Sequence, residues 1–341
     1  MRVDLLKNLA VSKRWLVTGA AGFIGSHLVH YLLEHGQNVI GLDNFSTGSI
    51  ENLEAIKSSL QNGKIDNFSF IEGDISDFET CNEVSSNIDF VLHQAALGSV
   101  PRSIADPITT NASNINGFLN MLKACADNNV NKFVYAASSS TYGDHTALPK
   151  KEDVIGKPLS PYAVTKYVNE LYAEVFSKLY AIQCVGLRYF NVFGPRQDPQ
   201  GAYAAVIPRW INASLNEQDL IIHGDGNTSR DFCYVENVIH ANIQAALCEQ
   251  MEPSVVYNIA YGERTTLNNL LKIIKQELEK LQIFSKSNVI YTDFRTGDVR
   301  HSLADISLAR KSIDYNPKYD VKQGLAKTVE WYAQEFNKNN L

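Results

Sequence analysis

The chain has 341 residues, of which 45% are hydrophobic and 20% are charged, as is usual for a globular protein with one large or two modest domains. Its formal net charge of -6 argues against nucleic acid or an anionic membrane as the main partner. No apolar run approaches the roughly 18 residues of a membrane span, and the N-terminus lacks the layout of a signal peptide. Because its five cysteines are widely spaced, we expect a cytoplasmic protein with buried thiols and no metal site.

The first motif along the chain is a glycine-rich turn between a strand and a helix. Residues 1–12 have the leucine spacing of a short helix, and 14–18 form an apolar run typical of a buried strand. In the turn that follows, Gly19 makes the tight bend, Gly22 lets the backbone approach a pyrophosphate, and Gly25 lets the next helix pack closely. The amides at the start of that helix favour an anion. The pattern predicts a dinucleotide site.

An acidic residue specifies which dinucleotide is expected. The second predicted strand, 37–42, ends at Asp43, which lies 18 residues beyond Gly25. A carboxylate there can bind the adenosine ribose hydroxyls and would repel a 2′-phosphate. The sequence therefore favours NAD over NADP.

Further strands are predicted at residues 68–75, 90–96 and 132–137, with helical segments between them. Alternating strands and helices predict an α/β fold of the Rossmann type, in which helices cover both faces of a doubly wound parallel sheet. We expect residues 1–190 to form this domain. His93 lies within an apolar run and is interpreted as a hydrogen-bonded core histidine.

Hydroxyl side chains at 138–142 follow the fifth strand, at the edge of the sheet where ligands bind. A helix start comes next, with Ser160 as N-cap and Pro161 at the first position. Tyr162 and Lys166 are one turn apart on this helix and share a face. We expect the ammonium and the helix N-terminus to move the pKa of the phenol towards neutrality, which would make it a general base. Taken alone, the pair is equally consistent with a solvated helix edge.

In this order and spacing, the glycine turn, Asp43, the hydroxyl run and the Tyr-Lys pair resemble the extended short-chain dehydrogenase/reductase family. The segments 92–96, 188–191, 229–232 and 295–298 are similar to UDP-hexose 4-epimerases. Two more, 95–103 and 298–302, are similar to a bacterial subgroup that acts on UDP-N-acetylglucosamine and related N-acetylated or uronate sugars in surface-polysaccharide synthesis, such as that of O-antigen.

The resemblance implies a set of site residues. Ser138, Tyr162 and Lys166 would be catalytic. The NAD contacts would come from Gly19, Gly22, Phe23, Ile24, Gly25, Asp43, Asn44, Ser46, Gly48, Asp74, Ile75, Gln94, Ala96, Tyr162, Lys166, Tyr189 and Val192. The UDP-sugar contacts would come from Gly98, Ser99, Ser138, Ser139, Ser140, Asn191, Ala205, Val206, Arg230, Arg295, Asp298, Arg300 and Ser302.

Within the substrate set, Arg230 and Arg295 would neutralise the diphosphate, as the bidentate geometry of arginine allows. Arg230 could instead form a surface ion pair with Asp231. The small Ser302 would leave room for an N-acetyl group, where a bulky aromatic residue would exclude it.

The C-terminal half, residues 191–341, is expected to be a smaller UDP-sugar-binding domain interleaved with the first, because in this family the chain returns to the sheet near 231–260. Residues 191–204 resemble a crossing loop, 205–215 a helix, and 219–224 a short strand. The resemblance also implies a homodimer through the helix that begins after Ser160.

The resulting hypothesis is an NAD-dependent UDP-N-acetylglucosamine 4-epimerase that works through a 4-keto sugar. The corresponding N-acetylhexosaminuronic acid and plain UDP-glucose remain alternative substrates. A 4,6-dehydratase or a decarboxylase would need carboxylates where this chain has Ser139 and Ser140. A sensor that binds the cofactor without catalysis would usually lack Tyr162.

Overall fold

The computed structural model describes residues 9–60, 63–200, 204–249, 252, 254–294 and 299–339. The helix predicted over 1–12 lies mostly outside this range, and its described end, 9–12, is turn and bend. The main sheet consists of β1 (Arg14–Thr18), β2 (Asn38–Asp43), β3 (Phe68–Glu72), β4 (Phe90–His93), β5 (Lys132–Ser138), β6 (Gln183–Tyr189) and β11 (Ser254–Ile259).

These seven strands pair in the order β11-β6-β5-β4-β1-β2-β3, and every pairing is parallel. From β1 the chain adds β2 and β3 on one side of the sheet and then β4, β5, β6 and β11 on the other. The crevice between β1 and β4, where the order reverses, is where ligands of such sheets bind. The predicted doubly wound Rossmann-type sheet is confirmed. The strands expected at 68–75 and 90–96 end sooner than predicted, at Glu72 and His93.

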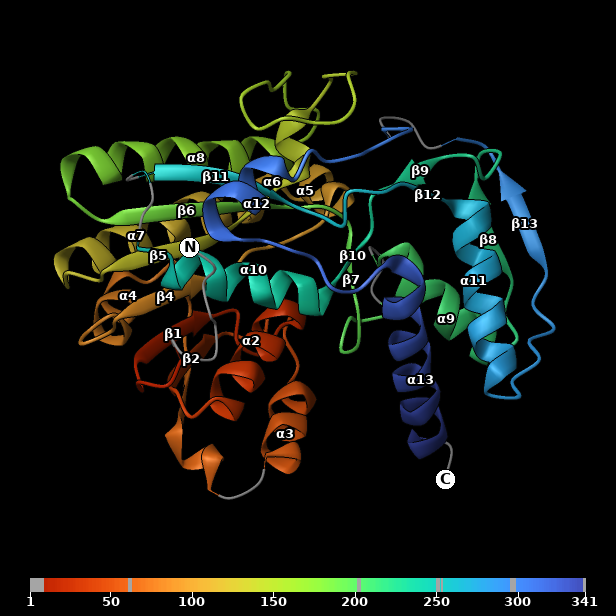
Figure 1. Cartoon of the computed structure of the whole chain (residues 1–341), viewed down its shortest axis with the longest axis horizontal. Coiled ribbons are helices and arrows are strands. Elements are labelled where there is room, and N and C mark those ends of the chain that lie inside the picture. The colour runs from red at the N-terminus through yellow and green to blue at the C-terminus, as the bar shows by residue number, and fades with distance from the viewer. Residues whose placement is uncertain are drawn as a thin grey trace.

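Helices cover both faces of the sheet (Figure 1). One face carries α2 (Phe23–Glu34), against which α3 (Ile50–Ser59) packs, and α10 (Val235–Leu247). The other carries α4 (Phe78–Val84), α7 (Phe118–Asp127) and α8 (Pro161–Leu179). Within β1, Trp15 and Val17 join the first core and Leu16 joins the second, as the alternation of side chains along a strand requires.

Short elements build the edge of the sheet that faces the site. They are α5 (Val100–Ala105), α6 (Pro107–Asn111), the π-helical η2 (Ala112–Gly117) and η3 (Ser139–Tyr142), whereas η1 (Lys64–Asn67) precedes β3 at the opposite edge. His93 is 4% exposed, lies 2.9 Å from the Thr18 hydroxyl through Nδ1, and stacks on Phe133. Burial lowers its pKa to about 3. The prediction of a core histidine is confirmed.

The rest of the chain forms a smaller unit to the right of the sheet in Figure 1. It contains α9 (Val206–Leu215), β8 (Leu220–His223), α11 (Leu267–Lys280), β13 (Val289–Thr292) and α13 (Val321–Asn339), with α12 (Ser307–Ile313) beside β11. Two further pairs are β7 (Val192–Phe193) with β10 (Cys233–Tyr234), and β9 (Ser229–Arg230) with β12 (Thr265–Thr266).

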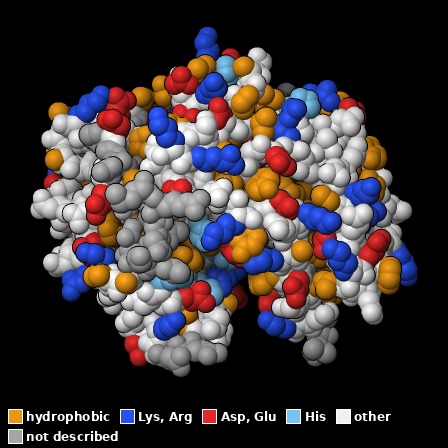
Figure 2. Space-filling model, viewed as in Figure 1, with side chains coloured by type: hydrophobic (Ala, Val, Ile, Leu, Met, Phe, Trp, Pro, Cys, Tyr) orange, Lys and Arg blue, Asp and Glu red, His pale blue; other side chains and the backbone are white. Residues whose placement is uncertain are grey.

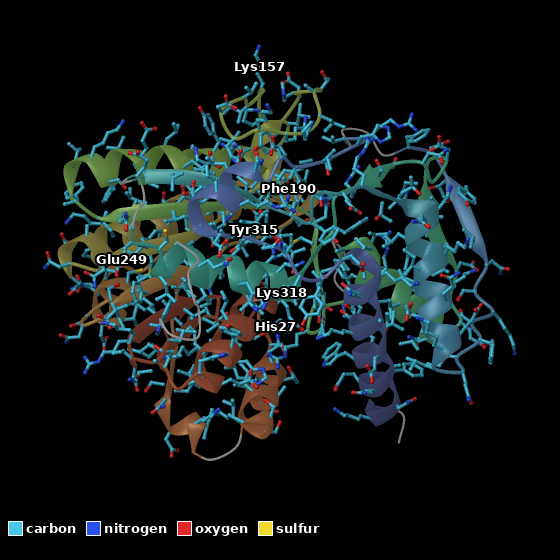
Figure 3. All side chains as sticks on the ribbon, viewed as in Figure 1. His27, Lys157, Phe190, Glu249, Tyr315 and Lys318 are labelled. Carbon is cyan, nitrogen blue, oxygen red and sulfur yellow. The ribbon has the colours of Figure 1, made fainter. Side chains whose placement is uncertain are left out.

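The expected return of the chain to the sheet near 231–260 is half correct. β11 does join the main sheet beside β6, but β10 pairs with β7 instead. The reason is that the chain enters α10 directly after Tyr234, so that this segment contributes a helix to the face of the sheet. The crossing loop after β7 is fastened to α2, because Nε2 of His27, labelled in Figure 3, donates to the Pro195 oxygen at 3.0 Å.

On the face shown in Figure 2, basic and acidic side chains are interspersed, in keeping with the small net charge. In the part of the chain that the structure describes, none of the helices combines the length and the apolar character that crossing a bilayer would take. All five cysteines are buried, as predicted.

Candidate active site

A cleft of about 350 Å³ opens at the carboxyl ends of the main-sheet strands. Most of the residues that the sequence assigned to the cofactor line it together with the catalytic set: Gly19, Gly22, Phe23, Ile24, Gly25, Asp43, Asn44, Ser46, Asp74, Ile75, Gln94, Ala96, Ser138, Tyr162, Lys166, Tyr189 and Val192. Gly48 lies behind the lining, where an added Cβ would be 3.0 Å from Oδ1 of Asp43. Residues from seven segments thus converge on one cavity.

The glycine turn forms one end of this cleft. Gly19 has a φ of +70°, and a Cβ on it would lie 2.8 Å from the amide nitrogen of Ala95. A Cβ on Gly25 would lie 1.9 Å from the Gly19 oxygen, so only glycine lets α2 start this close to the turn. The N-cap of α2 is Gly22, which has no side chain to bond the first amides of the helix. Uncapped amides at a helix start inside a cleft suit a diphosphate.

Asp43 and Asp74 lie at neighbouring strand ends on the same side of the cleft. Asp43 is 8% exposed, and its carboxylate accepts the amides of Ala21 and Phe45, both at 2.9 Å. Asp74 accepts the Asn44 side chain at 2.6 Å. Burial alone would raise the pKa of Asp74, but hydrogen bonds from Ser76 and Asn44 outweigh it and lower the pKa. Both carboxylates are therefore held in place and keep free lone pairs for hydroxyl donors.

Tyr189 and Gln94, which line the middle of the cleft, are joined by a residue that does not line it. The Tyr189 hydroxyl lies 3.1 Å from Oε1 of Gln94, and the buried Asn242 on α10 bonds both side chains, at 2.9 Å and 3.1 Å. This closed triangle ties α10 to the floor of the cleft. The sequence pattern did not indicate Asn242, because a single asparagine on a buried helix carries no spacing signal.

Tyr162, Lys166 and Ser138 meet where the cleft reaches α8. Ser160 caps this helix through a bond from the amide of Ala163 at 3.1 Å, and Pro161 occupies its first turn, as predicted. The Lys166 ammonium donates to the Ala136 oxygen at 2.8 Å and lies 6.0 Å from the centre of the Tyr162 ring. Ser138 ends β5, and its hydroxyl accepts from Ser140 at 2.9 Å.

The prediction that Lys166 moves the pKa of Tyr162 towards neutrality was wrong for the protein without NAD. Burial raises the pKa of Tyr162, and a hydrogen bond with Ser138 lowers it by less. Burial also lowers the pKa of Lys166, to about 8, although the Glu170 carboxylate raises it. The sequence shows the spacing of the pair but not the loss of water around it, and desolvation disfavours the charged form of both groups.

A second cleft, of about 380 Å³, lies in the smaller unit and shares Asn191 with the first. Val206, Arg230 and Arg300 line it, as the sequence suggested for the substrate. Arg230 donates to the oxygens of Ser229 and Arg300. Asp231 is fully buried, so the alternative of a surface ion pair with Arg230 does not hold.

Ser302 lines neither cleft, but it contacts Asn191, which lines both. Its hydroxyl accepts from the side-chain amide of Asn191 at 3.5 Å, and its own amide donates to the Ser229 oxygen. Arg295 and Asp298 lie outside the described residues. Gly98 lines the first cleft, whereas Ser99, Ser139, Ser140 and Ala205 belong to neither lining. Ser99 and Ala205 instead occupy N-cap positions, of α5 and α9.

Both clefts also contain residues that the sequence reasoning missed. In the first these are Leu42, Thr47, Gly73, Ala95, Ser113, Ala136 and Ala137. In the second they are Arg209, Trp210, Ile221, His223, Thr228, Phe232, Leu267 and Phe294. The alanines at the end of β5 had a signal, because small residues at a strand end allow a ligand to approach. The second group comes from three separate elements and the loops between them, and no local pattern links them.

The residues of the first cleft fit NAD. Its glycine turn leaves space that any Cβ would fill, its helix start offers free amides, and Asp43 offers acceptors for ribose hydroxyls. The second cleft continues from the nicotinamide end through Asn191 and carries arginines, which suit a second phosphate-containing ligand. Two ligands bound end to end would meet near Tyr162.

The comparisons agree with this geometry. The family described as NAD dependent epimerase/dehydratase matches residues 15–260. The chain is 34% identical to the UDP-glucose 4-epimerase of Mycolicibacterium smegmatis, over 94% of this chain and 99% of that protein.

Two solved structures are similar over nearly the whole chain. One is the UDP-N-acetylglucosamine 4-epimerase of Methanobrevibacter ruminantium with UDP-N-acetylmuramic acid, at 41% identity and a TM-score of 0.86, covering 95% of this chain and 99% of that one. The other is the UDP-glucuronic acid 4-epimerase of Bacillus cereus with UDP-glucuronic acid and NAD, at 33% identity and a TM-score of 0.82, covering 94% and 99%. The resemblance drawn from the motifs is confirmed.

Proposed function

This chain belongs to the NAD-dependent epimerase/dehydratase family, and we propose that within it the chain is a UDP-N-acetylglucosamine 4-epimerase, which interconverts UDP-GlcNAc and UDP-GalNAc. NAD would bind in residues 1–190 with the contribution of α10 and β11, and the UDP-sugar mainly in residues 191–341. The two clefts that meet at Asn191 support this division.

The observation that carries the choice of sugar is the position of Ser302. Its hydroxyl accepts from the side-chain amide of Asn191, the residue that lines both clefts, so Ser302 would stand directly behind the place where a sugar meets Tyr162. A serine there leaves the space that an N-acetyl group needs, and a tyrosine would fill it. The similarity to a UDP-N-acetylglucosamine 4-epimerase at 41% identity supports the same choice.

The chain's own residues supply the acid-base chemistry. Burial raises the pKa of Tyr162, so its phenolate would form only when NAD is bound. It would then take the proton of the C4 hydroxyl, and Ser138 would hold that hydroxyl and share its proton. Lys166, fixed by its bond to the Ala136 oxygen, stabilises the negative charge on Tyr162. NAD, held by the glycine turn and Asp43, would supply a reversible hydride acceptor for C4, and its positive charge would favour the phenolate of Tyr162. The arginines of the second cleft hold the diphosphate while the sugar turns.

Two other substrates and one other reaction compete with this proposal. Similarity to UDP-glucuronic acid and UDP-glucose 4-epimerases keeps the uronate and the plain hexose as alternatives. Dehydration or decarboxylation would need a carboxylate beside the catalytic hydroxyl, and η3 offers Ser139 and Ser140 at that place. Elimination then lacks its acid and base.

We also propose a homodimer through α8. Among its described side chains, Val164, Leu171, Val175 and Leu179 are exposed, at 45%, 45%, 48% and 72%. These residues are seven, four and four positions apart, so they form one stripe on the helix. A second copy of the chain would cover it. Val175→Asp should convert a dimer to a monomer in analytical ultracentrifugation. A parent protein that sediments as a monomer contradicts the proposal.

The test of function is to incubate the purified protein with four substrates separately: UDP-GlcNAc, UDP-GalNAc, UDP-glucose and UDP-glucuronic acid. Chromatography of the products should show the fastest conversion for the N-acetylated pair. Faster turnover of UDP-glucose or UDP-glucuronic acid would refute the choice of sugar but keep the epimerase. A 4-keto-6-deoxy product would refute the reaction itself.

A further inference from the structure

Asn258, on β11, lines neither cleft, yet its fully buried side chain connects three separate segments. Its Nδ2 donates to the backbone oxygens of Lys150 and Asp305, both at 3.0 Å, and its Oδ1 accepts from the Tyr142 hydroxyl at 2.6 Å. Because carbonyl oxygens only accept, these bonds determine the orientation of the amide. Every hydrogen-bonding atom of the side chain is therefore in use.

The first of these segments is the hydroxyl turn η3, which begins after Ser138 and ends at Tyr142. The Arg188 guanidinium packs on the Tyr142 ring, 4.8 Å from its centre. Arg188 in turn makes two bonds, of 2.9 and 2.8 Å, to the buried Glu170 carboxylate on α8. Tyr142 is thus held between α8 on one side and Asn258 on the other, so the end of the hydroxyl turn has a defined position.

The second segment, 302–305, carries the side chain that faces the sugar in the proposed function. Its first residue, Ser302, accepts from the side-chain amide of Asn191, which lines both clefts, although Ser302 itself lines neither. Its middle is held by the amide of Ala304, which donates to the buried Asp231 carboxylate at 3.1 Å. At the end of the segment, the Asp305 oxygen accepts from Nδ2 of Asn258. The segment is therefore held at Ala304 and at Asp305, behind the proposed sugar pocket.

The third segment runs between these two. The amide of Lys150 donates to the Leu303 oxygen at 2.7 Å, and the amide of Asp305 donates to the Lys150 oxygen at 2.9 Å. The loop after η3 therefore pairs directly with 302–305, and Asn258 closes the junction from behind.

We infer that Asn258 is a positioning residue for sugar selectivity: by joining Tyr142 to Asp305 it fixes the gap between the hydroxyl turn and the segment that carries Ser302. This inference rests on the proposed function, because it concerns the pocket that would hold the sugar. In the proposed pocket an N-acetyl group would extend towards Ser302, whereas a plain hexose would stop short of it. Loss of the connection should therefore weaken the larger substrate more than the smaller one.

Tyr142→Phe tests this directly, because it removes the hydroxyl and keeps the ring on Arg188. We expect kcat/KM for UDP-GlcNAc to fall about tenfold and kcat/KM for UDP-glucose to fall less than about threefold. NAD bound per chain should stay the same. The change leaves Oδ1 of Asn258 without its donor. If that variant does not fold, Asn258→Asp serves, because it keeps the acceptor for Tyr142 and breaks the same connection at Asp305.

Tyr315→Phe is the matched control. Tyr315, labelled in Figure 3, also donates from a buried hydroxyl to a backbone oxygen, that of Ala260 at 2.8 Å, but it contacts neither η3 nor 302–305 in this way. The Tyr315→Phe variant should leave the ratio of kcat/KM for UDP-GlcNAc to kcat/KM for UDP-glucose unchanged. A Tyr142→Phe variant that loses both activities by the same factor would overturn the inference while the proposed function stands. A parent protein that converts no N-acetylated sugar overturns both.

Discussion

Gly25→Ala should disrupt the glycine turn, because α2 packs against it without room for a side chain. The new Cβ would lie 1.9 Å from the oxygen and 2.7 Å from the carbon of Gly19. Real Cβ atoms essentially never come within 3.0 Å of another atom, so helix and turn would have to separate by about 1.1 Å. Both contacting atoms belong to the backbone, so no side chain can rotate away. We expect the free energy of unfolding to fall by about 3 kcal/mol.

Substitutions at two other glycines distinguish this loss of packing from a loss of NAD binding and from backbone strain. At Gly22 a Cβ would lie 3.2 Å from the Gly19 oxygen, and φ is -78°, so Gly22→Ala should cost less than about 1 kcal/mol of stability. Its methyl group would nevertheless enter the cleft and weaken NAD binding. Gly36 has a φ of +70° with nothing within 4 Å of a Cβ. Gly36→Ala should cost about 1–2 kcal/mol through strain and leave NAD binding intact.

Urea unfolding and titration with NAD would measure the two effects separately. Gly25→Ala should lose both stability and NAD affinity, Gly22→Ala mainly affinity, and Gly36→Ala mainly stability. A Gly25→Ala protein that binds NAD as the parent does and unfolds within 0.5 kcal/mol of it, roughly the scale of a neutral surface change, would refute the reasoning.

Three further predictions concern the reaction. Tyr162→Phe should lower turnover by about 10²- to 10⁴-fold and leave bound NAD in place; full activity in that variant would exclude Tyr162 as the base. Ser302→Tyr should lower kcat/KM for UDP-GlcNAc by at least about tenfold and spare UDP-glucose; an unchanged preference would place the N-acetyl group elsewhere. The pKa of Lys166 is about 8 in the folded, NAD-free protein and 10.5 ordinarily, so the unfolded chain binds more protons between these values. The free energy of unfolding should therefore rise with pH across that window, by up to about 3 kcal/mol relative to Lys166→Met. Urea unfolding that gives both proteins the same dependence on pH would contradict the buried ammonium.

The elements that line the first cleft were predictable because their signals are local. The strand before Gly19, the glycine spacing and Asp43 each follow from a few neighbouring residues, and their order along the chain specifies where they meet in a parallel sheet. Ser160 and Pro161 likewise identified the start of α8, because N-caps act on the next turn alone.

What escaped prediction depends on contacts between distant residues. The pKa of Tyr162 follows from burial by several segments, which spacing on one helix does not show. The two-residue strands β7 and β10 are too short for any periodicity, so their pairing was not foreseen. Asn242 and Asn258 act through partners more than 40 residues away along the chain, and each lies in an apolar element where its neighbours give no indication of its role.

The most direct test of the proposed reaction is the fate of the hydrogen at C4. UDP-GlcNAc carrying deuterium at C4 is incubated with the protein in ordinary water, and the products are examined by mass spectrometry and NMR. Because the hydride would leave and return within one closed site, UDP-GalNAc should form with the deuterium still at C4. Loss of the deuterium to solvent, or no formation of UDP-GalNAc, would contradict the account.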